Sequence, residues 1–302
     1  MIQMKSVFTK ILFFFLVTIN LIDAQNKLAY TLKVGDHFKV KQVANQDIFQ
    51  NMYGQKHVMK NLLEGDFSFV VEDVDDSLYG LKFKFDRFKM SSSSNLRGEI
   101  MSVNTDDTVT DDDIEGEIFS ELVSVNLTMT LYKNGKIKST EGSYELISKI
   151  VNAVGAIDEL TKEVMRESIK GEFSNENIAM SFEQITYIYP NKTIAIGGTC
   201  KNNFEDKLSS KNTWPLNSIT KEGVNITEES SVIFKNTDVD VEMNLNGDMT
   251  SNLTTSPETG FVKTMTTSST VKDNSIVHNM DGLEVPTTII SNVTYKIEKH
   301  VQ

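Results

Sequence analysis

The chain has 302 residues, a formal net charge of −12, four prolines and a single cysteine. An acidic surface repels phosphates and anionic headgroups, so composition argues against a nucleic-acid partner and against adhesion to anionic membranes. One cysteine excludes an intramolecular disulfide, and a chain of this length buries an adequate core without one.

The first predicted element is a cleavable export signal at residues 1–24. Two lysines precede an apolar run, Ile11 to Ile19. That run is shorter than the stretch of about 20 apolar residues that crosses a bilayer. We therefore expect cleavage after about Ala24 and a periplasmic or extracellular protein that is soluble, with no transmembrane segment in the mature chain. The alternative is an uncleaved membrane anchor.

Period-2 alternation of apolar and polar side chains dominates the first half of the chain. It is strict from Gly80 to Asp86, and it recurs from Phe67 to Val71 and from Phe119 to Leu131. Such alternation predicts strands with one face in a core and the other in water. Asn134-Gly135 predicts a type I′ hairpin turn, which needs two positive φ angles and joins antiparallel strands.

Acidic residues cluster at 106–117, and we interpret this stretch as a solvated loop. Closely spaced carboxylates suit Ca²⁺, but the glycine and distal glutamate of an EF-hand are missing. The four histidines lack the spacing of metal ligands. We therefore predict no metal site and no cofactor.

The period changes to three and four residues within a central segment at about 143–190. From Tyr144 to Ile169 the apolar positions fall on one face of a helix, which Lys170-Gly171 is expected to end. A second, shorter helix is predicted from a cap near Ser174 up to Pro190. The expected order is strands, a helix pair, then strands.

Alternation returns in the last third of the chain. It spans Val239 to Leu245, a Thr-rich run after Phe261, and Ile289 to Ile297, while Asn246-Gly247 and Thr259-Gly260 predict turns. We therefore predict an α+β fold in which residues 25–302 form a single domain. Its main part is a large, curved, mostly antiparallel sheet, an incomplete barrel, with the helix pair packed on one face.

Motifs of catalysis are missing: the sequence holds neither a nucleophile elbow nor a P-loop, so we expect no enzymatic activity. We interpret Cys200 as a buried thiol rather than a nucleophile. We interpret Trp214 as a structural aromatic rather than a ring on which a ligand stacks. Five Asn-x-Thr sequons would carry glycans only in a eukaryotic secretory pathway; they lie at Asn126, Asn191, Asn225, Asn252 and Asn292.

Short motifs along the chain resemble one family. They are Leu32–Phe38, Ile48–Gln55, Ile194–Gly198, and Leu245-Asn246-Gly247 followed by Thr259–Val262. In this order they resemble an uncharacterised family of exported Bacteroidota proteins, a domain of unknown function, which implies no activity. Gly198-Thr199-Cys200 departs from that family's usual Val-Gly-Asp-x-Trp. The helix-on-curved-sheet layout is also similar to periplasmic lipoprotein carriers, which hold acyl chains between an incomplete barrel and covering helices.

Two hypotheses for function follow. The first is an envelope carrier or sensor of a hydrophobic small molecule such as a lipid, bound against the apolar concave face of the sheet. Four residues are predicted to line that site, with a dry core as the alternative: Val123, Val125, Leu127 and Met129. The second hypothesis is a non-enzymatic assembly protein that contacts an envelope protein or a glycan through polar strand faces rich in Thr, Asn and Asp.

Overall fold

The computed structural model describes residues 28–110, 113–155, 158–189, 194–205, 208–237 and 240–300, so the predicted export signal lies outside the described residues. A 12-stranded sheet forms most of the molecule, and its neighbouring strands pair antiparallel. The strands are β1 (His37–Met52), β2 (Gln55–Val74), β3 (Leu78–Ser94), β4 (Gly98–Asn104), β5 (Asn126–Tyr132), β6 (Ile137–Glu141), β7 (Thr199–Phe204), β8 (Leu208–Thr220), β9 (Gly223–Thr237), β10 (Val241–Thr255), β11 (Val262–Val277) and β12 (Leu283–His300).

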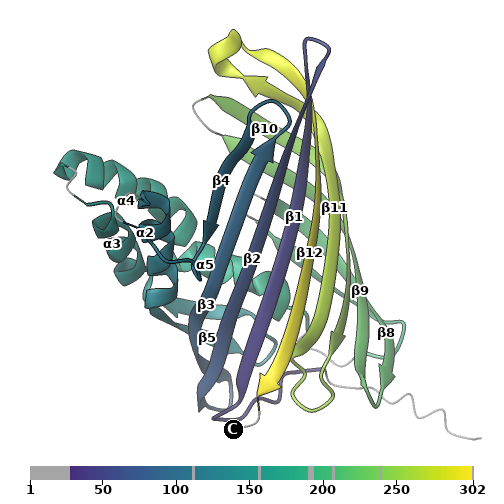
Figure 1. Ribbon diagram of the computed structural model, residues 1–302. Coiled ribbons are helices and arrows are strands. Elements are labelled where there is room, and N and C mark those ends of the chain that lie inside the picture. Colours follow the sequence, from purple (N-terminus) through teal and green to yellow (C-terminus); the bar gives the residue numbers. More distant parts are fainter. Residues whose placement is uncertain are drawn as a thin grey trace, which may run out of the picture.

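The sheet consists of two meanders joined where the first and last strands pair. Its order is β6-β5-β3-β2-β1-β12-β11-β10-β9-β8-β7, with β4 paired to the far end of β3. It curls strongly without closing on itself, and the helices gather beside β3 and β5 (Figure 1). The helical segment connects β6 to β7, the two ends of the sheet. The predicted α+β fold, with an open antiparallel sheet and a central helical insert, is confirmed.

Three helices occupy the central segment where two were expected. They are α3 (Ser143–Ala153), α4 (Glu159–Phe173) and α5 (Asn175–Thr186). The predicted long helix is broken because Gly155 adopts a φ of +66° and Asp158 then caps α4, accepting a hydrogen bond from the Thr161 amide. Helix α4 also continues past Gly171, and it ends at Ser174, which caps α5.

The strand predicted from Phe119 begins only at Asn126. A short helix, α2 (Ile114–Ser120), and a 3-10 turn, η1 (Glu121–Ser124), come first. Asp113 accepts a hydrogen bond from the Gly116 amide, and two glutamates fill the first turn of α2, where the helix dipole favours negative charge. Part of the acidic stretch is therefore a capped helix instead of the expected loop.

Two glycine predictions have different outcomes. The Asn134-Gly135 turn joins β5 to β6, but only Gly135 has a positive φ, so the turn is a type I turn closed by a glycine bulge instead of type I′. Asn246-Gly247 is not a turn and lies within β10. A Cβ on Gly247 would lie 1.9 Å from the Thr270 carbonyl oxygen, so this glycine allows a close approach of two strands.

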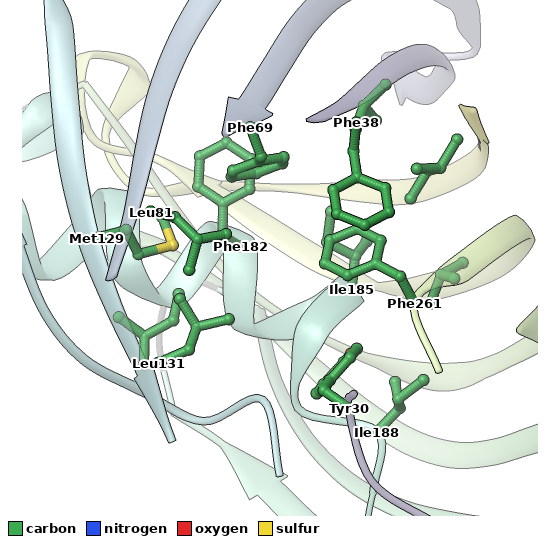
Figure 2. Packing of buried hydrophobic residues seen from close by; sticks show 14 of the residues in the cluster. Tyr30, Phe38, Phe69, Leu81, Met129, Leu131, Phe182, Ile185, Ile188 and Phe261 are labelled. Carbon is green, nitrogen blue, oxygen red and sulfur yellow. The ribbon is translucent and has the colours of Figure 1, made fainter. Parts of the chain in front are cut away.

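Helix α5 packs against the concave face of the sheet. The Phe182 ring meets the rings of Phe67, Phe69 and Phe83 at centroid distances of 5.3, 5.5 and 4.6 Å. Figure 2 shows Phe182 beside Phe69 in this core, with Ile185 close to Phe261. Edge-on aromatic contacts of this kind add about 0.5–1.5 kcal/mol each to the burial of apolar surface.

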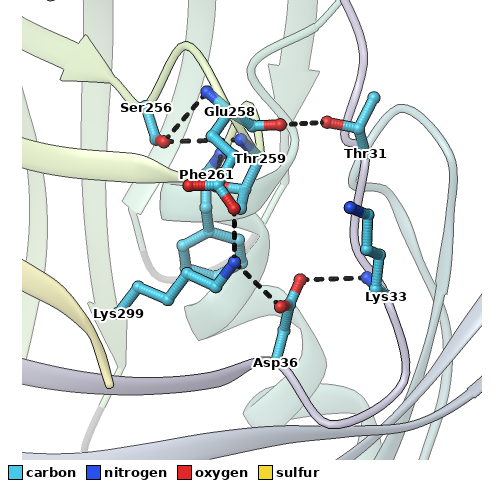
Figure 3. A network of polar contacts seen from close by, with 8 residues as sticks. All are labelled: Thr31, Lys33, Asp36, Ser256, Glu258, Thr259, Phe261 and Lys299. Carbon is cyan, nitrogen blue, oxygen red and sulfur yellow. Dashed lines mark hydrogen bonds and ion pairs between the residues drawn. The ribbon is translucent and has the colours of Figure 1, made fainter. Parts of the chain in front are cut away.

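The segment before β1 fastens one end of this core. The Tyr30 hydroxyl donates to the Thr186 carbonyl of α5 at 2.6 Å. Lys299 of β12 lies 2.9 Å from Asp36 and 2.7 Å from Glu258, and Thr31 donates to the Glu258 carbonyl (Figure 3). These contacts hold the N-terminal segment, the last strand and the β10–β11 turn together beneath α5.

Candidate ligand-binding cavity

One row of residues crosses four neighbouring strands on the concave face. Phe88, Gly65, Gln42 and Tyr295 are register partners on β3, β2, β1 and β12. Glycine has no side chain, so the row is hollow between the phenylalanine and the glutamine. A Cβ built on Gly65 would meet its nearest atom, Gln42 Oε1, at 3.7 Å, so the hollow has room for ordinary van der Waals contact.

The hollow is the floor of a cavity of about 220 Å³. Helices α4 and α5 cover it, and most of the lining is aromatic or aliphatic. The lining residues are Gln42, Leu63, Gly65, Phe67, Phe85, Phe88, Glu172, Phe173, Ile178, Ser181, Phe182, Ile185 and Tyr295. A concave, mainly apolar site with a few polar groups has the composition of small-molecule sites in general.

A β-bulge borders the cavity. The pairing of β2 with β3 shifts register between Asp66 and Phe67, so that Phe67 faces Phe85 while Gly65 faces Phe88. Bulges bend a strand and redirect its side chains. Both Phe85 and Phe88 consequently face the cavity, although they are three residues apart. Phe88 is in turn stacked on Phe119 of α2, with a centroid distance of 5.2 Å and an interplanar angle of 6°.

The cavity lies at a boundary between apolar and polar rows of the concave face. Below it, toward the N-terminal segment, the inward residues Val40, Phe67 and Ile297 are buried in the main core. Above it, beyond one further apolar row that includes Leu63 and Ala44, a hydrogen-bonded polar row crosses the same four strands. Its donor–acceptor distances are 2.7 Å for Ser92 to Asn61, 3.0 Å for Asn61 to Gln46, and 3.4 Å for Gln46 to Ser291.

Polar groups occupy two places around the cavity. Gln42 Nε2 donates to the Tyr295 hydroxyl at 3.2 Å on the sheet side. Burial raises the pKa of Tyr295 to about 12, so its hydroxyl stays protonated well above neutral pH. Glu172 and Ser181 are exposed on the helix side and mark the rim, where the Ser181 hydroxyl donates to the Asn177 carbonyl.

The four residues predicted to line an apolar site lie elsewhere. Val125, Leu127 and Met129 are fully buried in the main core, and Leu127 and Met129 face inward from β5. Val123 is half-buried in the turn η1. The 220 Å³ cavity is lined by other residues. Alternation had marked Phe67 and Phe85 as inward strand residues, but no local pattern marked Gly65, Gln42 or Tyr295.

The structure agrees with the predictions for Cys200, for Trp214 and for two of the five sequons. The Cys200 side chain is buried, and Trp214 is a core residue that donates from its indole nitrogen to Asn202 at 2.9 Å. Asn126 and Asn292 lie in strands, as expected, while Asn191 falls outside the described residues. Within the described ranges, no group of three or more His, Cys, Asp or Glu is arranged to hold a metal ion.

A second cluster of buried polar groups lies on β9 and β10. Glu228 is 1% exposed and accepts hydrogen bonds from Ser230 at 2.8 Å and from Ser251 at 2.5 Å. Burial raises the pKa of this carboxyl, and the two hydroxyl donors partly offset that effect. The cluster is separate from the residues that line the cavity.

Residues 76–262 match a family described only as one of unknown function, DUF6263. The chain belongs to this family. The match covers more than half of the chain, including all of β3, α4 and α5. The expected membership of a family without assigned function is confirmed. No curated protein matches the chain.

Two solved structures align with this chain at low sequence identity, and one of them has a TM-score above 0.5. A structure of lipovitellin, described for its lipid–protein interactions, aligns at 9% identity with a TM-score of 0.52 over 90% of this chain. It covers 26% of the lipovitellin chain, so our protein corresponds in length to about a quarter of that molecule. An outer membrane channel from Pseudomonas putida F1 aligns at 8% identity over 89% of this chain and 97% of its own, with a TM-score of only 0.26. In the part of the chain that the structure covers, no helix has the length and apolar character to cross a bilayer.

Proposed function

We propose that this protein binds the apolar part of an amphiphilic small molecule, such as a lipid, in the cavity beneath α5. We further propose that it acts as a carrier or sensor in the cell envelope, and not as an enzyme. The observation that carries the proposal is the hollow at Gly65, which lies between an aromatic core and a polar row. An amphiphile placed there buries its apolar end and directs its other end toward polar side chains.

The covering helices support this proposal. Helix α4 has no fully buried residue, and it contacts the core only through partly buried side chains such as Ile169 and Phe173. Phe173 is also part of the cavity lining. A cover with few buried apolar contacts opens at low free-energy cost, as ligand entry requires. The similarity to lipovitellin, whose structure is described for its lipid–protein interactions, is consistent with the proposal at the level of fold.

The test measures ligand binding before and after a side chain is introduced at Gly65. Delipidated protein is titrated with the neutral fluorescent dye N-phenyl-1-naphthylamine, and we expect saturable binding. Gly65→Leu places a side chain in the hollow and is expected to abolish binding. Gly65→Ala is the matched control, because its added Cβ meets no atom closer than 3.7 Å, and it is expected to retain binding. Dye binding by Gly65→Leu equal to that of the unmodified protein would place the dye elsewhere and contradict the proposal.

Contact with a glycan or an envelope protein is the second candidate function. The observation that favours it is a hollow of about 510 Å³ on the outer face of β10–β12, whose exposed lining includes Asn246, Thr250, Ser268 and Asn292. Soluble envelope oligosaccharides added to the isotopically labelled protein should then shift the backbone amide signals of these residues in NMR spectra. Shifts confined to the residues around Gly65, or no shifts, would contradict this second function.

A further inference from the structure

The polar end of the cavity, formed by Gln42 and Tyr295, indicates which class of ligand the cavity binds. This inference rests on the proposed function. Gln42 and Tyr295 are uncharged. Beyond the bond that joins them they offer the Gln42 carbonyl oxygen as an acceptor and two donors, the Tyr295 hydroxyl and the second hydrogen of Gln42 Nε2. Gln42 uses its Nε2 to donate to the tyrosine. Its Oε1 faces the hollow, since it is the atom nearest to the Cβ position of Gly65.

The Tyr295 hydroxyl accepts from Gln42 but donates to no protein group in the described part of the chain. Like any tyrosine hydroxyl it is protonated at neutral pH, and burial raises its pKa further. The hydroxyl is therefore a donor, and Gln42 Oε1 is an acceptor, at the same end of one cavity. A ligand hydroxyl satisfies both, because it accepts from Tyr295 and donates to Gln42.

Charge along the cavity disfavours an ionised ligand. Glu172 is the single charged residue of the lining, and it is acidic. The inward residues of β1 that continue above Gln42 are uncharged, namely Ala44, Gln46, Ile48 and Gln50. A carboxylate in this site would lose its hydration without gaining a cationic partner, which is strongly unfavourable.

The volume limits the apolar part of the ligand. An engineered apolar cavity of about 150 Å³ binds benzene. The cavity of about 220 Å³ is therefore large enough for one ring with a substituent, or for a short alkyl chain of comparable volume. A longer tail, or the naphthyl group of N-phenyl-1-naphthylamine when its phenyl ring is bound, would have to leave through the rim between Glu172 and Ser181.

We infer that the cavity binds an uncharged amphiphile by its hydroxyl group, held between Tyr295 and Gln42, in preference to a fatty-acid anion of the same length. The apolar body of this ligand lies on Gly65 beneath Phe182. The hydroxyl replaces the water that hydrates the two side chains, while the aromatic lining excludes water from the remainder of the ligand.

The test compares 1-octanol with octanoate as competitors of N-phenyl-1-naphthylamine on the delipidated full chain near neutral pH. We expect 1-octanol to bind at least about tenfold more tightly, because only octanoate brings an uncompensated charge into the cavity. Tyr295→Phe removes the donor and should weaken 1-octanol about threefold to tenfold, the usual range for one hydrogen bond. Gln42→Leu is a second variant with the same expectation.

Tyr79→Phe is the control, because Tyr79 is a buried tyrosine outside the cavity lining. It should leave the affinity for 1-octanol unchanged. Two results overturn this inference. One is that octanoate binds as tightly as 1-octanol. The other is that the folded variants Tyr295→Phe and Gln42→Leu bind 1-octanol with unchanged affinity. Dye binding that neither competitor displaces also overturns it and leaves the proposed function standing. Absence of saturable dye binding overturns both.

Discussion

Replacement of Phe182 by alanine tests how α5 is held on the sheet. This ring is 8% exposed and contacts three phenylalanine rings from β2 and β3. Core Phe→Ala substitutions cost about 3–5 kcal/mol, and each aromatic pair adds about 0.5–1.5 kcal/mol to area burial. One side of the ring faces the cavity, so it lacks contacts there and the loss is reduced. We therefore expect about 4 kcal/mol.

The assay is urea unfolding followed by circular dichroism. With a slope of about 3 kcal/mol per molar, a loss of 4 kcal/mol lowers the midpoint by about 1.3 M. Tyr144→Ala is the control, because Tyr144 on α3 is 82% exposed, and it should change the stability by no more than about 0.5 kcal/mol. A loss below about 1.5 kcal/mol for Phe182→Ala would refute the packing of α5 against the aromatic cluster.

Three further predictions concern other contacts. Gly247→Ala should destabilise the protein by more than about 1 kcal/mol in urea unfolding, because the added Cβ would lie 1.9 Å from a backbone oxygen. Gly65→Ala should be neutral or slightly stabilising. Equal changes in the free energy of unfolding for the two variants would contradict this account. Burial raises the pKa of Glu228, so the folded state binds this proton more tightly than the unfolded chain, and stability falls as pH rises through the folded-state pKa. Glu228→Gln should therefore be more stable than the unmodified protein near pH 8, an advantage that disappears toward about pH 4; a pH-independent difference would argue against the raised pKa. Lys299→Met removes the cation shared by Asp36 and Glu258 and should cost about 1 kcal/mol, less in high salt; a cost that salt leaves unchanged would indicate lost packing of the lysine stem instead.

Most of the sheet was predictable because its signal is local. Alternation at Phe67–Val71 and Gly80–Asp86 marks strands whose inward residues the structure buries. The change to helical spacing near residue 143 marks the insert between β6 and β7. These patterns follow from the two-residue repeat of a strand and the 3.6-residue repeat of a helix, so neighbouring residues in the sequence are sufficient to reveal them.

The errors arose where apolar periodicity does not decide the local structure. Gly247 has the sequence context of a turn, yet its function is to admit the Thr270 carbonyl from the neighbouring strand. The helix break at Gly155 follows from a positive φ that apolar spacing does not encode. Val123 continues a strand-like alternation but lies in a 3-10 turn after α2. None of these three outcomes can be predicted from periodicity alone.

The candidate site was beyond sequence reasoning for a related reason. Gly65, Gln42 and Tyr295 meet because the first strand pairs with both the second and the last, in one particular register. A shift of one residue in either pairing would move a different side chain into the row. The sequence contains the glycine and its neighbours, but only the register brings them together as the floor of a cavity.

Native mass spectrometry of the protein, purified gently from its own source, is the most direct test of ligand binding in the cavity. We predict a reproducible additional mass that organic extraction removes, and we predict that Gly65→Leu, purified in the same way, lacks it. A folded, monodisperse sample with the mass of the bare polypeptide in both cases would contradict the proposal. The cavity beneath α5 would then be an unfilled packing defect of the core.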